Sequence, residues 1–431
     1  MLHIDRQLRA DFSWVLSGNV IYSACQWCIV IFLAKLGSPE DVGLYALGMA
    51  VSAPIILFAN LQVRTLLASD VKDEFRFGQY LAFRFVTLAI ALVAILGVAA
   101  WSGSDWRHHC IIALVGFAQM LESVSDTYYG LMQKYDRMDR MSRSLMIKGP
   151  LALAFLGITM YLTRNVLWAV LALALGRTLI VLVWDSRLGF TRRVDHRLAA
   201  RLEWNNSDMF RLFRLALPLG IILMLSSLNS NIPRYFIEGH RGTAELGIYS
   251  AIASLLTAGS LFVSAFGQSI MVPAARAAAD GDRPRYHSFI WQTLLLGAIL
   301  GMGAVVTATI GGSFLLTHIF RPEYGKHADV FVWLMGAGIV LFMTDGIGYV
   351  MTAARALKPQ VPLRLVNCTV TAIASAWLIP RHGLRGAAEA IVIAAVVQLA
   401  GAAIILWNID RRLAAVPSVL EPEPTSAAIT I

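Results

Sequence analysis

Five polar side chains recur at spacings of 3, 4, 3 and 4 along an otherwise apolar stretch near residues 109–133. These spacings place them on one face of a helix. Two of them, Glu122 and Asp126, are carboxylates four residues apart, and two such groups in a low dielectric rarely both ionise. The chemistry that they could do is the binding of a proton or another cation. The whole face consists of Gln119, Glu122, Asp126, Tyr129 and Gln133.

A match between the two halves of the chain indicates a further carboxylate, Asp345. Ser125-Asp126 corresponds to Thr344-Asp345 at an offset of 219 residues. We hypothesise that Glu122, Asp126 and Asp345 form a protonation switch, in which loss of charge permits a cavity to close on its cytoplasmic side. The alternative is a structural polar seam, in which these acids pair with Arg177 or another buried arginine.

Three arginines near predicted helix ends could bind an anion, because a planar guanidinium donates two parallel hydrogen bonds to a phosphate group. With neighbouring amides, the expected cavity set is Arg64, Arg84, Arg234, Asn60, Gln62, Asn231 and Gln268. Pro233 cannot donate to its helix and pushes away the carbonyl of Asn229, so we expect a kink that could serve as a gate. The alternatives are that Arg64 only orients the chain and that Arg234 reaches the membrane interface from a frayed helix end.

Patterns for catalysis and metal binding are absent, since the sequence has no Walker loop, no H-E-x-x-H and no G-x-S-x-G. Cys25 and Cys28 form a C-x-x-C inside an apolar stretch, where packing explains them better than redox chemistry. We therefore expect no enzymatic activity, no cofactor and no metal.

Composition indicates which elements position these groups. The 431 residues are 57% hydrophobic and 15% charged, with a mean hydropathy of +0.64, whereas soluble domains have about 25% charged residues. The runs 85–104 and 289–320 contain no Asp, Glu, Lys or Arg, and about 20 apolar residues cross a bilayer as a helix. The chain is therefore predicted to be an all-α polytopic membrane protein. Its net charge of +9 is explained by loop cations, so we expect no nucleic-acid partner.

Hydropathy predicts twelve transmembrane helices, near residues 12–34, 43–68, 81–101, 109–133, 144–162, 166–185, 209–236, 245–273, 286–311, 327–354, 361–380 and 386–408. An even number places both termini on one side of the membrane. The ends and loops on that side hold 26 Lys and Arg residues, and the opposite side holds 9. Because such residues accumulate in cytoplasmic loops, both termini are expected in the cytoplasm.

The two halves of the chain resemble each other weakly. Asp41-Val42-Gly43-Leu44-Tyr45 matches Glu245-Leu246-Gly247-Ile248-Tyr249 at an offset of 204 residues. This offset spans six helices, which is typical of a parallel repeat with two six-helix lobes around a central cavity. The expected divisions are a lobe over 1–185, a basic cytoplasmic linker over 186–208, a second lobe over 209–409 and a disordered cytoplasmic tail over 410–431.

Several stretches together resemble the bacterial polysaccharide exporters, of the O-antigen translocase type, in the multidrug/oligosaccharidyl-lipid/polysaccharide flippase superfamily. They are Asn60-Leu61-Gln62-Val63-Arg64, Phe77-Gly78-Gln79-Tyr80-Leu81, Leu121-Glu122-Ser123-Val124-Ser125-Asp126, Gln133-Lys134-Tyr135-Asp136-Arg137, Asn231-Ile232-Pro233-Arg234-Tyr235-Phe236 and Met351-Thr352-Ala353-Ala354-Arg355. The resemblance covers nearly all of the chain except the tail. Well-studied members have arginines on the first helix, and the predicted first helix here has none.

This resemblance implies a cationic cavity, alternating access and a multi-pass position in a bacterial inner membrane. It also implies a function, the movement of an undecaprenyl-diphosphate-linked oligosaccharide from the cytoplasmic to the periplasmic leaflet for O-antigen or another surface polysaccharide. The implied partners are that lipid-linked glycan, membrane lipids and other proteins of polysaccharide assembly. One alternative is an ion-coupled multidrug exporter of the same superfamily. The other is a membrane polysaccharide polymerase or ligase, which would be expected to carry a large periplasmic loop.

Overall fold

The computed structural model describes residues 2–70, 72–101, 105–186, 202–356 and 358–414, and its regular elements are all helices. They are α1 (Leu2–Leu36), α2 (Pro39–Asn60), α3 (Val63–Ser69), α4 (Phe77–Trp101), α5 (Trp106–Lys134), α6 (Met138–Thr163), α7 (Val166–Ile180), the π-helix η1 (Val181–Asp185), α10 (Asn206–Arg241), α11 (Thr243–Ala279), α12 (Arg283–Ile319), α13 (Pro322–Gly325), α14 (Ala328–Ala353), α15 (Gln360–His382) and α16 (Leu384–Ala414). Within these residues, twelve helical segments are long and apolar enough to cross a membrane, which confirms the predicted number. Most of the predicted basic linker, residues 187–201, and the predicted tail from 415 lie outside the described residues.

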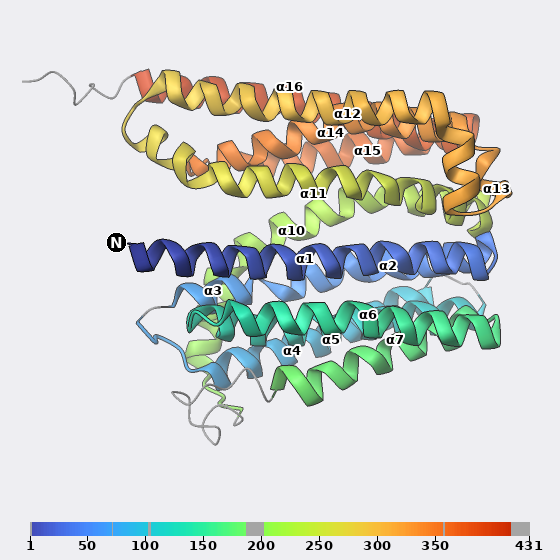
Figure 1. Cartoon of the computed structure of the whole chain (residues 1–431), viewed down its shortest axis with the longest axis horizontal. Coiled ribbons are helices and arrows are strands. Elements are labelled where there is room, and N and C mark those ends of the chain that lie inside the picture. The colour runs from blue at the N-terminus through green and yellow to red at the C-terminus, as the bar shows by residue number, and fades with distance from the viewer. Residues whose placement is uncertain (1, 71, 102–104, 187–201, 357, 415–431) are drawn as a thin grey trace, which may run out of the picture.

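The helices form two groups that lie side by side (Figure 1). We call α1 to η1 the N-terminal half and α10 to α16 the C-terminal half, and the predicted domain limits remain a prediction. The first helix begins and the last helix ends at the same end of the bundle, on the left of Figure 1, which we call the terminal end. The other end, which carries α13, is called the opposite end.

Three helices of the C-terminal half are much longer than hydropathy predicts. The helices α10, α11 and α12 contain 36, 37 and 37 residues. At a rise of 1.5 Å per residue each is about 55 Å long, while the hydrocarbon core is about 30 Å thick. Their ends therefore extend beyond the apolar layer, where polar composition hides helical structure from a hydropathy scan.

The second predicted span is interrupted, contrary to the expectation of one helix over 43–68. Leu61 and Gln62 both adopt the left-handed conformation, with φ of 45° and 51°, and separate α2 from α3. This conformation costs about 1–2 kcal/mol for a residue with a side chain. Neither residue is Gly or Pro, so the sequence carries no signal for the break. It lies directly between Asn60 and Val63, at the edge of the polar interior described below.

The helix α2 is the centre of the molecule. In its most apolar window 67% of the residues are buried, against 11% in α1. It contacts α5 within its own half and also packs on α10 and α11 of the other half. Its contact with α10 is close, because Gly220 lies against Leu61 and the hydroxyl of Tyr235 donates to the carbonyl of Ala50.

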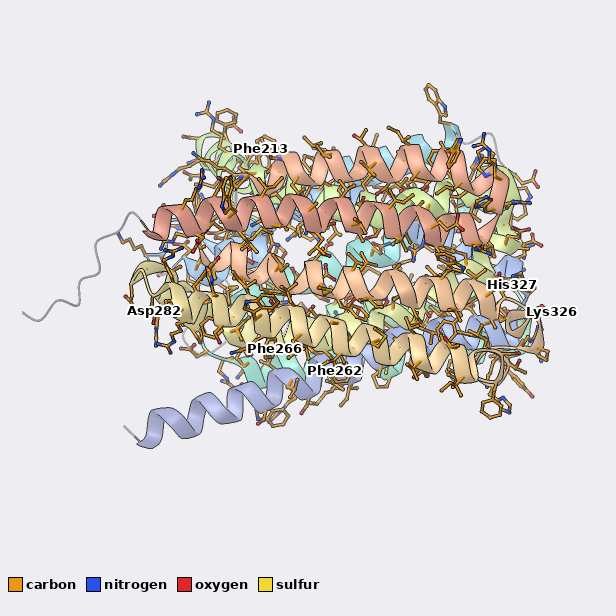
Figure 2. The ribbon with its side chains drawn as sticks, turned by 90° about the horizontal axis from the view of Figure 1, so that it is seen from above. Phe213, Phe262, Phe266, Asp282, Lys326 and His327 are labelled. Carbon is orange, nitrogen blue, oxygen red and sulfur yellow. The ribbon has the colours of Figure 1, made fainter. Side chains whose placement is uncertain are left out.

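The corresponding contact between α1 and α11 is far looser. It includes one hydrogen bond, from Trp27 Nε1 to Ser254 Oγ at 3.2 Å. The helix α1 is instead held by α6, where Gly149 leaves room for Cys25. Figure 2 shows the first half of α1 projecting from the body of the molecule, on the side where Phe262 and Phe266 of α11 lie. The seam between α1 and α11 is thus the open counterpart of the closed seam between α2 and α10.

Candidate functional site

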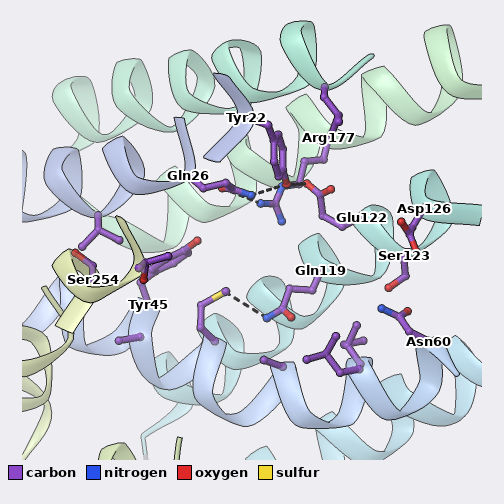
Figure 3. A pocket seen from close by; sticks show the side chains of 18 of the residues that line it. Tyr22, Gln26, Tyr45, Asn60, Gln119, Glu122, Ser123, Asp126, Arg177 and Ser254 are labelled. Carbon is purple, nitrogen blue, oxygen red and sulfur yellow. Dashed lines mark hydrogen bonds and ion pairs between the residues drawn. The ribbon is translucent and has the colours of Figure 1, made fainter. Parts of the chain in front are cut away.

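A cavity of about 710 Å³ lies between the two halves. Its polar and charged lining comes from α1, α2, α3, α5, α7, α10 and α11. The members are Asn19, Tyr22, Gln26, Tyr45, Asn60, Arg64, Gln119, Glu122, Ser123, Asp126, Tyr129, Arg177, Arg234, Ser250, Ser254 and Thr257. Figure 3 shows how most of the charged groups project from the N-terminal half, with Ser254 on the other wall.

The polar face of α5 forms the middle of the N-terminal wall. Gln119, Glu122, Asp126 and Tyr129 all line the cavity, as their helical spacing indicates. Gln133, the fifth member of that face, accepts a hydrogen bond of 3.4 Å from Arg64 Nε. This polar face of α5 therefore lies against protein and the cavity rather than lipid, as expected because a charged side chain inside a bilayer costs free energy.

Glu122 lies in a buried ion cluster (Figure 3). Lys148 Nζ of α6 lies 2.9 Å from its Oε2, and Arg177 Nε of α7 lies 3.1 Å from its Oε1. The hydroxyl of Tyr22 donates to the same Oε1 at 2.6 Å. With two cations for one carboxylate, this cluster joins α1, α5, α6 and α7. The pairing with Arg177 is the structural alternative that the sequence left open.

Asp126 is also paired, since its Oδ1 lies 3.0 Å from Arg64 NH1. Arg64 lies at the start of α3, directly after the left-handed break, and its guanidinium is also 5.9 Å from the ring centroid of Tyr129. Arg64 and Asp126 are each about one third exposed. This arginine thus reaches the cavity, as predicted, but together with a counter-ion.

Arg234 differs from the other two arginines of the cavity. Its NH1 donates to Asn231 Oδ1 at 2.7 Å, and its Nε is buried without a hydrogen-bond partner. Within the described part of the chain it forms no ion pair. Ser250 of α11, on the same wall, has a buried hydroxyl without a partner as well. The C-terminal wall therefore presents an unpaired cation and a free hydroxyl.

Four residues predicted for the cavity are not among those that line it. Arg84 is 0% exposed and donates to Asn60 Oδ1 and Thr127 Oγ1, at 2.8 and 2.9 Å, so it ties α4 to α2 and α5 behind the wall. Gln62 accepts a hydrogen bond from Thr65 within the left-handed break. Gln268 is an exposed residue of α11. Asn231 is buried, and its Nδ2 donates to the carbonyl of Ser227 at 2.8 Å while its Oδ1 accepts from Arg234. For these four the prediction of a cavity position is corrected, because spacing along one helix does not show which face its neighbours cover.

The predicted gating residues are also dispersed. Asp345 of α14 is not among the residues that line the cavity, so it does not face Asp126 across it. Pro233 is buried in α10 beside Arg234, and Asn229 accepts a hydrogen bond of 2.6 Å from Thr371 of α15. Roles in coupling or gating for Glu122, Asp126, Asp345 and Pro233 remain predictions.

Sequence reasoning did not single out Tyr22, Lys148, Ser144 or Asp185. Lys148 belongs to the 26 Lys and Arg residues that are expected in the ends and loops on the side of the termini, yet it is 1% exposed and forms an ion pair with Glu122. Its position after the apolar pair Met146-Ile147 was the available signal for burial. Asp185 is 0% exposed at the end of η1. No group of three or more metal-ligating side chains occurs among the residues that the structure covers.

At the opposite end the two halves close on each other. Arg321 NH1 donates to the carbonyl of Gly37 at 2.7 Å. Nε2 of His108 lies 3.8 Å from Glu238 Oε1 of α10. The N-terminal parts of α2 and α11 cross at Gly43 and Gly247, where each glycine lies against the backbone of the other helix. The cavity is therefore closed toward the opposite end.

Comparison with known proteins places this geometry in a family context. A family model described as polysaccharide biosynthesis protein matches residues 8–277. A capsular polysaccharide biosynthesis protein, CapF of Staphylococcus aureus, is 26% identical over 398 residues, which cover 90% of this chain and 96% of that protein.

Two solved structures share the fold. One is the inward-facing conformation of a multidrug resistance MATE family transporter of the MOP superfamily, with a TM-score of 0.77 and 12% identity, covering 94% of this chain and 99% of that one. The other is the lipid II flippase MurJ in an inward closed conformation, with a TM-score of 0.69 and 10% identity, covering 93% of this chain and 90% of that one. At these identities the likeness establishes the fold alone.

Proposed function

Since the chain belongs to the family of polysaccharide biosynthesis proteins, we propose that it translocates an undecaprenyl-diphosphate-linked oligosaccharide across a bacterial inner membrane. The cargo is a repeat unit for O-antigen or another surface polysaccharide. It enters from the cytoplasmic leaflet and leaves into the periplasmic leaflet by alternating access. Membrane lipids and other proteins of polysaccharide assembly are the further partners. No bond of the cargo is broken, so the activity is transport rather than catalysis.

The observation that carries this proposal is the unpaired guanidinium of Arg234 on the cavity wall. A cation withdrawn from water without a counter-ion is costly, and an anionic ligand would offset that cost. The cavity lining contains two more arginines and two carboxylates, so one net positive charge remains. A diphosphate suits such a site, because its oxygens accept the paired donors of a guanidinium.

The shape of the site supports a cargo that is half lipid and half sugar. A volume of about 710 Å³ lies within the usual range of about 300–1,000 Å³ for small-ligand sites. Amide groups on the N-terminal wall and hydroxyl groups on both walls can donate to sugar hydroxyls. The loose seam between α1 and α11 would let a polyprenyl chain remain in the bilayer while its headgroup is inside.

The orientation follows from charge. The terminal end carries most of the Lys and Arg residues of the loops, and such residues accumulate on the cytoplasmic side. We therefore assign the terminal end to the cytoplasm and the opposite end to the periplasm. The state described here is then closed to the periplasm, which suits loading from the cytoplasmic leaflet.

An ion-coupled multidrug exporter is the second candidate. The likeness to a MATE family transporter and the acids on the cavity wall favour it. Against it, Glu122 and Asp126 are each in contact with a cation and offer little to a cationic drug. A polymerase or ligase is less favoured, since connections at the opposite end such as 37–38 and 164–165 are short.

A cellular test separates these functions. In a strain that lacks this protein, wild-type protein and Arg214→Ala should restore surface glycan, while Arg234→Ala should not. Arg214 is a matched control, because it is an exposed arginine on the same helix, 4.4 Å from the ring of Phe210. Full surface glycan with Arg234→Ala at normal protein level would contradict the proposal. Increased drug sensitivity without a loss of glycan would favour the exporter.

A further inference from the structure

Asp185 is a buried carboxylate that the proposed transport does not use. It is the last residue of η1 and is 0% exposed. Its Oδ2 accepts a hydrogen bond of 2.6 Å from Ser125 of α5, and its Oδ1 accepts one of 2.5 Å from Ser144 of α6. Among the residues that the structure describes, it forms no ion pair. π-helical turns are rare and occur frequently at functional sites.

This environment distinguishes Asp185 from the acids of the cavity wall. Each wall acid has a cation in contact, Arg64 for Asp126 and both Lys148 and Arg177 for Glu122. Two charged groups act on Asp185 from a greater distance, Lys148 on α6 and Glu122 on α5. Lys148 and Glu122 contact each other at 2.9 Å, so Glu122 largely neutralises the positive charge of Lys148. The other titratable neighbours are the phenols of Tyr128 and Tyr129 on α5.

A chain of hydroxyl groups joins Asp185 to the cavity. Ser144 Oγ lies 2.8 Å from the hydroxyl of Tyr129, and Tyr129 is part of the cavity lining. A serine hydroxyl has one hydrogen to donate. When Ser144 donates to an ionised Asp185, Tyr129 must donate to Ser144. The phenol then presents only a lone pair to the cavity.

We propose that Asp185 binds a proton that arrives from the cavity through Tyr129 and Ser144, and that this proton reverses the donor direction of the chain. Tyr129 takes a proton from cavity water and passes its own to Ser144, which passes its own to Oδ1 of Asp185. Each hydroxyl gains one proton and loses one, so the net result is one neutral carboxylic acid. Ser125 continues to donate to Oδ2 in both forms.

The reversal changes what the cavity offers to an anion. With Asp185 protonated, Ser144 donates to Tyr129, and the phenol hydrogen points into the cavity beside Arg64. A phosphoryl oxygen can then accept from both groups. Proton binding and anion binding therefore favour each other, and the coupling is reciprocal. This second part rests on the proposed function, whereas proton binding by Asp185 does not.

The proton site is tested without any cargo. Infrared difference spectra of the purified full-length protein, recorded on lowering the pH, should show the carbonyl band of a newly protonated carboxylic acid. Asp185→Asn should lose that band, and Asp105→Asn should keep it, since Asp105 is an exposed acid whose side chain makes no capping bond. Asparagine keeps one acceptor and one donor, so the variant is expected to fold. An undiminished band in Asp185→Asn would overturn the proposal.

The relay is tested with inorganic diphosphate as the probe. Wild-type protein should bind it at least about fivefold more tightly when Asp185 is protonated, as for a typical coupling of two sites. Asp185→Asn should bind with the low-pH affinity at every pH. Tyr129→Phe should remove the pH dependence of diphosphate binding and should slow the appearance of the infrared band, because the phenol is the route by which the proton reaches Asp185. Unchanged pH dependence in Tyr129→Phe would exclude the relay, and the infrared result would stand separately.

Discussion

Gly43 and Gly247 each lie against the backbone of the other's helix at the closed end of the cavity. A Cβ atom on Gly43 would lie 1.8 Å from the carbonyl oxygen of Thr243, and one on Gly247 would lie 1.8 Å from that of Pro39. Each glycine meets the residue four positions before its counterpart, so the crossing has the two-fold symmetry of the 204-residue repeat. Only glycine permits this approach of the two backbones.

Replacing either glycine should open the opposite end of the cavity, which we assign to the periplasm. Because a Cβ atom cannot be accommodated at 1.8 Å, Gly43→Ala or Gly247→Ala forces α2 and α11 apart where the halves meet. The population should shift away from the state described here, and more so for valine than for alanine. A cysteine placed at Asn60 should then react several-fold more slowly with a cytoplasmic thiol reagent, and surface glycan should fall in the same order.

The matched control is a glycine with open space around it. Gly97→Ala and Gly303→Ala add a methyl group that meets nothing within 4 Å, so labelling and surface glycan should stay at the wild-type level. Labelling of the Gly43→Ala protein at the wild-type rate, with normal expression, would show that the crossing does not determine the closed state.

Most of the fold could be predicted from sequence, because of two facts. Charged residues are excluded from the apolar layer of a bilayer, and matching residues of the two halves are separated by a similar number of positions. The twelve spans and the cavity-facing stripe of α5 follow from these two facts. The break at Leu61 and Gln62 could not be predicted, since neither residue favours a left-handed backbone on its own. The break lies where α10 packs closely on this segment, because Gly220 lies against Leu61.

The candidate site was predictable only in part. Polar residues in apolar helices indicate which helix faces lie inside the protein. They do not show which member of each ion pair lines the cavity. Arg84 and Lys148 look like other membrane arginines and lysines in sequence, yet both are buried in protein. Their hydrogen-bond and ion-pair partners lie on other helices, α2 and α5, and no local spacing encodes that arrangement.

The Glu122 cluster should contribute to stability. Glu122→Gln leaves Lys148 and Arg177 without their carboxylate, and breaking a buried pair in this way costs about 3–5 kcal/mol in soluble proteins. The melting temperature in detergent should therefore fall. Adding Lys148→Met should recover part of the loss, because the two residues interact directly and their effects are not additive. If the two changes lowered the melting temperature additively, the described contact would not hold the cluster together.

Arg64 should be needed for cargo rather than for folding. Arg64→Ala removes a guanidinium that is one third exposed to the cavity, so we expect surface glycan to be lost at normal protein level. Arg64→Lys should keep some function, because lysine supplies the charge without the planar fork. Both results are read from surface glycan together with immunoblots of the membrane fraction. Full surface glycan in Arg64→Ala would remove this residue from the binding site.

The assigned orientation predicts the result of reporter fusions. Fusions after Arg140, Arg197 and Asp282 should report the cytoplasm, and fusions near Asp105, Arg241 and Glu323 should report the periplasm. Of the first set, Arg140 and Asp282 lie at the terminal end, while the second set lies at the opposite end. A periplasmic signal from the fusion after Arg197 would reverse the orientation and with it the direction of loading.

Translocation in reconstituted vesicles tests the central claim most directly. Protein in proteoliposomes is supplied with a labelled undecaprenyl-diphosphate-linked oligosaccharide, and the fraction that crosses the bilayer is followed with a membrane-impermeant sugar-binding protein. We predict transfer by wild-type protein and by Arg214→Ala, and none above empty vesicles by Arg234→Ala. Equal transfer by the Arg234→Ala and wild-type proteins would contradict an anion site at this arginine, and no transfer by the wild-type protein would contradict the proposed function.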